Sequence, residues 1–79
     1  MTLEELTVNV AEILEIEPSE LLAESTVETV ETWDSMASLG IISMLDDETD
    51  GDITAEDADA LISFEAVVDL ARAKGIIGG

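Results

Sequence analysis

Ser35 carries the hydroxyl group in this sequence that is best placed for chemistry, because it follows Asp34 directly at the start of an apolar segment. Aspartate is a favoured helix N-cap, so Ser35 is expected to open a helix at the end of a loop. Free backbone N–H groups and the helix dipole at such an end favour an anionic ester on that hydroxyl. The alternative interpretation is that Asp34 and Ser35 only cap a helix.

No other residue type in the chain would make Ser35 the nucleophile of an enzyme. The sequence has no His and no Cys, which excludes a Ser-His-Asp triad, a thiol nucleophile and a Cys/His zinc site within this chain. Any modification of Ser35 therefore needs a separate enzyme, and the protein itself is expected not to be one.

Acidic residues dominate the charge, with 20 Asp and Glu against 2 Lys and Arg, for a net charge of −18. Two cations cannot neutralise a phosphate backbone, so nucleic-acid binding is excluded. The acids Asp46, Asp47 and Glu48 end the segment that Ser35 opens. Together with Asp34 they predict a docking surface for basic patches on partner proteins. The alternative is a solvated face that only aids solubility.

The segment Asp46–Asp57 also resembles the loop of an EF-hand. Acids stand at loop positions one, three and five, with glycine at six and isoleucine at eight. The last position holds Asp57 instead of Glu, and the chain has no second loop to pair with this one. A calcium-binding regulatory module is thus an alternative function. Weak binding of a divalent cation is a milder form of it, at Asp46, Glu48, Asp50 and Asp52.

The C-terminal residues Ile76-Ile77-Gly78-Gly79 end in the Gly-Gly pair that ubiquitin-like modifiers and sulfur carriers also have. Those proteins are built on a strand-rich sheet, whereas the pattern here is helical. A frayed tail after the last helix is therefore the expected structure.

Hydrophobic periodicity predicts the elements that must position these residues. A capping box formed by Thr2 and Glu5 opens the first helix, and Thr54 and Ser63 are further N-cap signals. Gly75 is expected to end the last helix. The predicted helices are about Thr2–Glu15, Ser35–Glu48, a short one from Thr54 through Ala58 to Leu61, and one from Ser63 to Gly75.

The segment between the first two helices, Glu17 to Trp33, is irregular and reads as a long loop, with a short helical turn at Ser19–Ala23. No run alternates with a period of two, so no strands are expected. The result is a single all-α domain over residues 1–79, a small four-helix bundle with antiparallel packing, a long first loop and a short third helix. Trp33 should anchor the loop. On the second helix an apolar stripe of Met36, Leu39, Ile42 and Leu45, broadened by Ile41 and Met44, is expected to face the core. On the last helix the inward residues are expected to be Phe64, Val67, Val68, Leu70 and Ala71.

Over nearly all of its length the chain resembles free-standing (type II) acyl carrier proteins. The attachment motif of that family, Asp-Ser-Leu at the start of the second helix, appears as Asp34-Ser35-Met36. The acidic end of that helix appears as Leu45-Asp46-Asp47-Glu48, and the short third helix as Ile53 to Ala58. Small size, strong acidity and a long first loop also agree. Met36 replaces the usual Leu, a change of similar volume, and Gly40 stands where family members often carry an acid.

This resemblance implies that Ser35 carries 4′-phosphopantetheine, transferred from coenzyme A by a phosphopantetheinyl transferase. The terminal thiol would hold acyl groups as thioesters and present them to loading and transferring enzymes with basic docking patches. Asp34 and Met36 would flank the attachment site, and residues between the helices would take up the acyl chain. Fatty acid, polyketide, surface-sugar acylation and aminoacyl pathways are all compatible. A non-carrier interaction domain is a further alternative.

Location and assembly follow from what the sequence lacks. No stretch reaches the ~20 apolar residues of a membrane span, and the acidic N-terminus lacks the basic start of a signal peptide. The absence of cysteine gives no sign of an oxidising compartment. A cytoplasmic monomer without a membrane span is expected.

Overall fold

Four α-helices and one short 3₁₀ turn form the chain in the computed structural model, which describes residues 1–78. This part of the chain contains no strand, only an isolated bridge between Thr26 and Ser63. The all-α class, the long first loop and the short third helix are therefore confirmed. The elements are α1 (Leu3–Leu14), η1 (Pro18–Glu20), α2 (Ser35–Glu48), α3 (Ala55–Asp59) and α4 (Phe64–Ala73).

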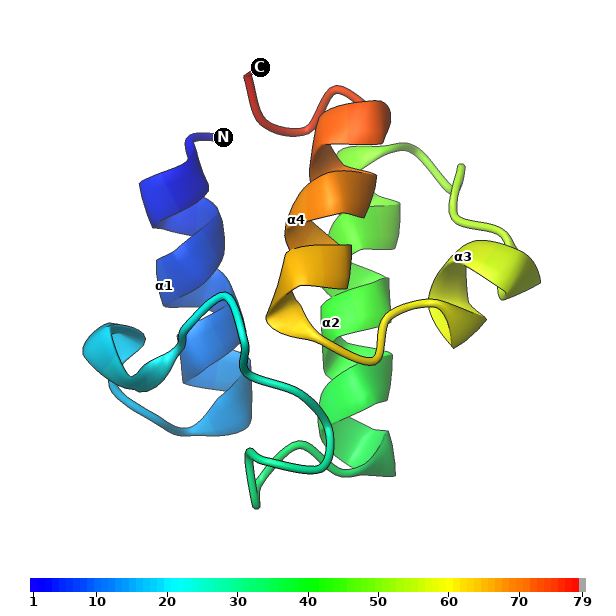
Figure 1. Cartoon of the computed structure of the whole chain (residues 1–79). Coiled ribbons are helices and arrows are strands. Elements are labelled where there is room, and N and C mark those ends of the chain that lie inside the picture. The colour runs from blue at the N-terminus through cyan, green and yellow to red at the C-terminus, as the bar shows by residue number, and fades with distance from the viewer. Residues whose placement is uncertain (79) are drawn as a thin grey trace.

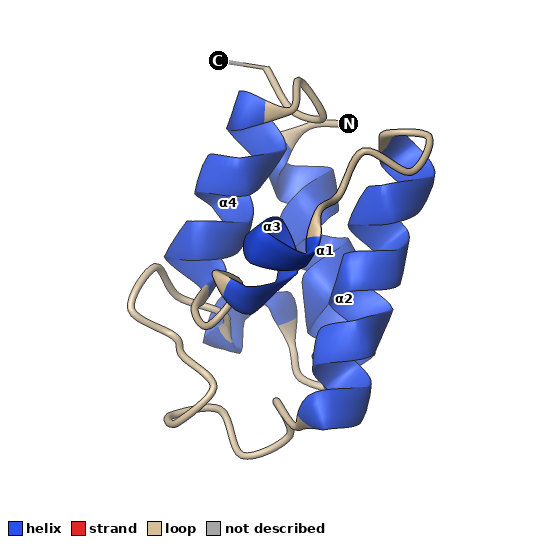
Figure 2. Cartoon of the chain, turned by 90° about the vertical axis from the view of Figure 1, so that its right-hand side faces the viewer, coloured by secondary structure: helices blue, strands red, loops and turns tan. Residues whose placement is uncertain are grey.

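Three long helices lie side by side, and the short α3 sits across the open side of α2 and α4 (Figures 1 and 2). Helix α1 runs opposite to α2, as predicted, but α2 and α4 run in the same direction. The expectation of antiparallel packing throughout is therefore wrong. Helix α3 and its two connections carry the chain back along α2, so α4 starts again from the end of the bundle where α2 starts.

Each helix begins where a side-chain oxygen replaces a missing backbone partner. The N-caps are Thr2, Asp34, Thr54 and Ser63, and each accepts a hydrogen bond from the backbone N–H three residues later. Such a cap satisfies one of the donors that a helix start leaves free. The four predicted N-terminal boundaries are therefore confirmed to within a residue. Helix α3 ends at Asp59, two residues before the predicted Leu61.

The core is built from small and branched apolar side chains of the three long helices. Helix α1 contributes four buried residues, α2 three and α4 three, and Trp33 anchors the loop as predicted, with 3% of its surface exposed. Val68, Leu70 and Ile42 pack against this core while half-buried. The buried apolar residues of the long helices are Leu6, Val10, Ala11, Leu14, Ala37, Ile41, Leu45, Phe64, Val67 and Ala71.

Helix α2 turns only part of the predicted stripe to the core, since Leu45 and Ile41 are buried. Met36 and Leu39 were expected inside, yet 78% and 62% of their surfaces are exposed. The buried stripe is Ala37, Ile41 and Leu45, spaced by four residues. Apolar residues lie on nearly every side of this helix, so periodicity alone left its orientation open.

Small residues on α2 let α1 approach closely. A Cβ atom added at Gly40 would lie 3.1 Å from Cγ2 of Ile13, which is tighter than ordinary van der Waals contact. The glycine therefore serves helix packing, even though glycine lowers the intrinsic stability of a helix by about 1 kcal/mol relative to alanine.

The long loop is attached to the start of α4 by two backbone hydrogen bonds. Val27 N–H donates to the carbonyl of Ile62 at 3.0 Å, and Phe64 N–H donates to the carbonyl of Ser25 at 2.9 Å. The buried Ser25 side chain in turn accepts from Leu22 N–H at 2.9 Å. The first two bonds fix the loop against the connection between α3 and α4. The predicted turn at Ser19–Ala23 appears slightly earlier, as η1.

The C-terminal tail is part of the core rather than frayed. Ile76 and Ile77 have only 7% and 3% of their surfaces exposed. Gly75, with φ of 76°, reverses the chain after α4, so that Ile76 N–H reaches the carbonyl of Ala71 at 2.8 Å. The prediction of a loose tail is therefore wrong for these two isoleucines, and its last residue, Gly79, lies outside the described residues.

Candidate functional site at the start of helix α2

Ser35 is the first residue of α2, and its side chain is exposed. The start of α2 lies at the end of the bundle opposite to both chain termini, next to the long loop (Figure 1). The hydroxyl is thus accessible to a second protein, as the sequence analysis required.

Asp34 holds the helix start that presents Ser35. Its Oδ1 accepts from Ala37 N–H at 2.9 Å, and its carbonyl accepts from Ser38 N–H at 2.9 Å. The amides of Ser35 and Met36 belong to the first turn, where no earlier helical carbonyl is available to them. An anionic ester on Ser35 would lie beside these amides and the positive end of the helix dipole.

An open groove of about 620 Å³ begins at Ser35. We call it the Ser35 groove. One wall comes from the long loop and the first half of α2, and the other from the end of α3 and its connection to α4. Its lining residues are Val27, Trp33, Asp34, Ser35, Ser38, Leu39, Ile42, Ala58, Asp59, Leu61 and Ile62. Sequence spacing gave no sign that residues 58–62 would face Ser35.

Exposed apolar side chains gather around the same hydroxyl. Residues 1–78 contain six large apolar residues that are exposed, and four of them are Val27, Met36, Leu39 and Ile62. We call these four the apolar rim. Three of them line the Ser35 groove and Met36 directly follows Ser35. Apolar side chains grouped beside a polar group are typical of a surface that a partner or ligand covers.

Trp33 lies between the groove and the core, with an unusual defect. Its indole Nε1–H is shielded from solvent and has no hydrogen-bond acceptor. Buried polar groups are nearly always paired, and an unpaired one costs about 1–3 kcal/mol. A hydrogen-bond acceptor near this unpaired (orphan) donor would remove that cost, and Trp33 lines the Ser35 groove.

The predicted docking acids lie in two places. Asp34 is next to Ser35, whereas Asp46, Asp47 and Glu48 form the last turn of α2. With a rise of about 1.5 Å per residue, Asp47 is about 18 Å along the helix from Ser35. Asp47 and Glu48 are exposed, while Asp46 is half-buried. The structure adds an acid that the sequence analysis missed, because Asp59 of α3 lines the Ser35 groove.

The segment Asp46–Asp57, whose EF-hand-like pattern gave the alternative function, does not gather its acids around one point. Across residues 1–78 no three acidic side chains gather closely enough to hold a metal ion. Asp46 and Glu48 are still helical, since α2 continues to Glu48, and Asp50 and Gly51 then turn the chain with φ of 54° and 84°. The predicted cation ligands Asp46, Glu48, Asp50 and Asp52 are therefore not brought together.

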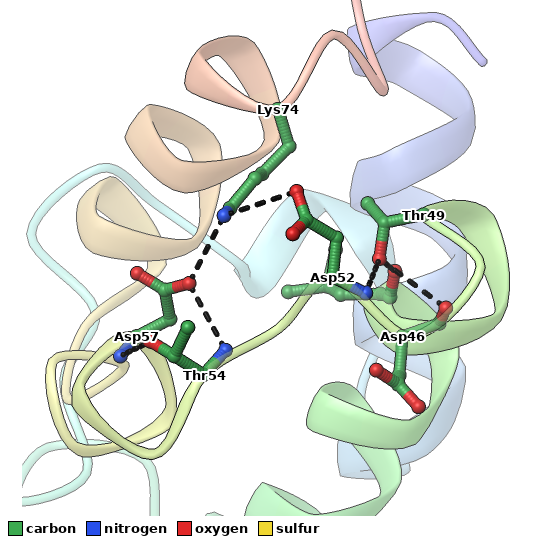
Figure 3. Close-up of polar contacts among 7 residues, drawn as sticks. Asp46, Thr49, Asp52, Thr54, Asp57 and Lys74 are labelled. Carbon is green, nitrogen blue, oxygen red and sulfur yellow. Dashed lines mark hydrogen bonds and ion pairs between the residues drawn. The ribbon is translucent and has the colours of Figure 1, made fainter.

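Asp57, the last residue of that segment, is occupied by other partners. Its Oδ2 accepts from Thr54 N–H at 3.1 Å and lies 3.2 Å from Lys74 Nζ (Figure 3). Lys74 Nζ also lies 3.3 Å from Asp52 Oδ2. We call Lys74, Asp52 and Asp57 the Lys74 clasp, because it joins the end of α4 to α3 and to the loop before it.

The clasp shifts the pKa values of Asp57 and Lys74 in opposite directions. The hydrogen bond from Thr54 N–H, followed by the one from Lys74, lowers the pKa of Asp57. The hydrogen bond to Asp57 raises the pKa of Lys74. The clasp therefore stabilises the fold at neutral pH. It is lost as the pH falls through the lowered pKa of Asp57, or rises through the raised pKa of Lys74.

None of the helices in residues 1–78 combines the length and apolar character needed to cross a bilayer. Comparison of the chain with protein-family models, with curated proteins and with solved structures found no match.

Proposed function

We propose that this chain is an acyl carrier protein, and that Ser35 is the attachment site of 4′-phosphopantetheine. One observation carries the proposal: an exposed serine at the start of a helix lines a groove that has exposed apolar residues along it. The family resemblance of Asp34-Ser35-Met36 supplies the identity of the group, and the geometry is compatible with it.

The residues around Ser35 fit such a group in two respects. The amides of the first turn of α2 favour its phosphate. The Ser35 groove offers room for a flexible chain. When bound, the group supplies a terminal thiol that this cysteine-free sequence lacks.

The attachment reaction balances with coenzyme A as the donor. The Ser35 oxygen forms a bond to the phosphorus next to the pantetheine, and the bond from that phosphorus to the bridging pyrophosphate oxygen breaks. Adenosine 3′,5′-bisphosphate leaves, and the hydroxyl proton goes to a base of the phosphopantetheinyl transferase. The chain itself needs no base, which agrees with its lack of histidine.

Partner enzymes would recognise the apolar rim together with the acids. A basic patch beside an apolar hollow complements Met36 and Leu39 next to Asp34 and Asp59. Single-sign charge speeds encounter without making binding tight, which suits a carrier that must leave each enzyme again. Asp46, Asp47 and Glu48 extend this charge to the far end of α2. A monomer in the cytoplasm is part of the same proposal.

The decisive experiment measures the mass of the protein after incubation with coenzyme A and a promiscuous phosphopantetheinyl transferase. The wild type should gain the mass of one 4′-phosphopantetheine group, and Ser35→Ala should gain none. Ser38→Ala is the matched control, because Ser38 lines the same groove one turn further along α2 and should leave the gain intact. Circular dichroism checks that all three proteins are folded. An unmodified wild type, or a gain that persists in Ser35→Ala, would refute the proposal.

A further inference from the structure

The orphan donor of Trp33 is the feature that the proposed function leaves unexplained. Only 3% of the surface of Trp33 is exposed, yet its Nε1–H has no hydrogen-bond acceptor. Phenylalanine could fill apolar space at this position without leaving a buried donor unpaired. The apo protein thus retains a polar atom that lowers its stability.

The position of Trp33 limits what the missing acceptor can be. The residue lines the Ser35 groove and stands two residues before Ser35. Two residues span at most about 7 Å of extended chain, so a group attached to Ser35 starts near the backbone of Trp33 and enters a groove that Trp33 lines. A group in the groove is therefore better placed to supply an acceptor than a distant segment of this chain.

The groove wall formed by α3 and the connection after it is partly exposed. Helix α3 has five residues and buries none of them, and the connection contains the exposed Ile62 next to the buried Leu61. The backbone bond from Val27 to Ile62 and the Lys74 clasp hold this wall in place. A group in the groove would therefore reach the shielded Nε1–H through a local shift of side chains that line the groove with Trp33.

We propose that Trp33 is a binding residue for the group on Ser35, donating a hydrogen bond from Nε1 to a carbonyl oxygen in the Ser35 groove. The inference depends on the proposed function, since the acceptor arrives with the 4′-phosphopantetheine group. That group has amide carbonyls of its own, and a loaded acyl group adds a thioester carbonyl. The bond holds the 4′-phosphopantetheine group, called the arm below, against the carrier. Release of the arm to a partner enzyme leaves the donor unpaired again.

Trp33 is the only tryptophan, so the protein has a single indole N–H signal in its nuclear magnetic resonance spectrum. Attachment should move this signal downfield and slow its exchange with water about fivefold or more, the equivalent of about 1 kcal/mol for one net hydrogen bond. A change in the unloaded carrier identifies an arm amide as the acceptor, and a change only after acyl loading identifies the thioester. Ser35→Ala treated identically should show no change.

Two failures are distinguishable by mass spectrometry on the same samples. A protein that gains mass while its indole shift and exchange stay constant, both unloaded and loaded, overturns the role of Trp33 and leaves the carrier function standing. A wild type that gains no mass overturns the carrier function and this inference together.

A thermodynamic cycle with Trp33→Phe tests the bond independently. Phenylalanine keeps an aromatic ring but has no N–H, and its packing defect is present before and after attachment. Attachment should raise the folded-to-unfolded ratio about fivefold more in the wild type than in Trp33→Phe. Equal effects in the two proteins would overturn the proposal. If the variant does not fold, the indole measurement on the wild type decides alone.

Discussion

Two substitutions of Asp34, to Ala and to Asn, separate its role as the N-cap of α2 from the effect of its negative charge. Its Oδ1 caps α2 by accepting from Ala37 N–H at 2.9 Å, and Ala37 is almost completely buried. Asp34→Ala leaves this N–H without a partner where water reaches it poorly, so the free energy of unfolding should fall by about 1–2 kcal/mol. Asp34→Asn keeps an acceptor at the same place and should cost about 0.5 kcal/mol or less, because Asn and Asp are comparable N-caps.

The matched control for charge is Asp47→Asn at the other end of α2. It removes one negative charge from an exposed residue without removing a cap. Loss of an acid near a helix C-terminus should stabilise the protein by a few tenths of a kcal/mol, about 0.3. Thermal unfolding followed by circular dichroism measures both effects, with about 4–8 °C per kcal/mol expected for a domain of this size.

The same three proteins then test docking through the initial rate of phosphopantetheine attachment. A unit charge about 8 Å from a cation on the transferase contributes about 0.5 kcal/mol in water, or about a twofold change in rate. Asp34→Asn should therefore be about twofold slower at low salt, and salt should remove the difference. If Asp34→Asn destabilises the fold as much as Asp34→Ala, the cap argument is wrong. If its rate equals that of the wild type at low salt, the charge argument is wrong.

Further predictions concern helix packing, the Lys74 clasp and the C-terminal tail. Gly40→Ala alone should raise the free energy of unfolding by less than the ~1 kcal/mol expected from helix propensity, because the new methyl group meets Cγ2 of Ile13. In an Ile13→Ala background the same substitution should give the full increase. Equal increases in the two backgrounds, measured by urea unfolding, would refute the contact. Lys74→Gln should lower the melting temperature at pH 7 more than Arg72→Gln, which removes the same charge from an exposed residue. This difference should vanish as the pH falls through the lowered pKa of Asp57. Ile77→Ala should cost about 2–4 kcal/mol in urea unfolding if the tail is core, while a cost below about 0.5 kcal/mol would show that it is loose.

The helices were predictable because the signals that start them are local. An N-cap such as Thr2 or Ser63 acts on an amide three residues away, so a short stretch of sequence contains the whole interaction. The exposed position of Ser35 followed from the same logic, since an N-cap at Asp34 places the next residue in the first turn. Local hydrogen bonds also explain why the helix boundaries agree to within one or two residues.

The orientation of α2 was not predictable in this way. Residues 36, 37, 39, 41, 42, 44 and 45 are all apolar, so several faces of the helix satisfy a hydrophobic pattern. Ala37 is buried and Met36 exposed because small side chains allow α1 to come close, as Gly40 and Ile13 show. The periodicity pattern alone placed the larger residues inside.

The tail was mispredicted for a related reason. Two glycines after Ile77 suggested a loose end, but Gly75 folds the chain back and buries both isoleucines. The gain from covering apolar surface depends on a cavity that only the assembled helices provide.

The sequence by itself determined the helical class, the long loop, the strong acidity and an accessible serine at the start of α2, since these depend on composition and on contacts within a few residues. Tertiary structure alone decided that Ala58, Asp59, Leu61 and Ile62 line a groove with Ser35, and that the indole of Trp33 stays unpaired. Those features depend on how α3 and its connections bring distant segments together, and the packing of side chains across helices sets that path.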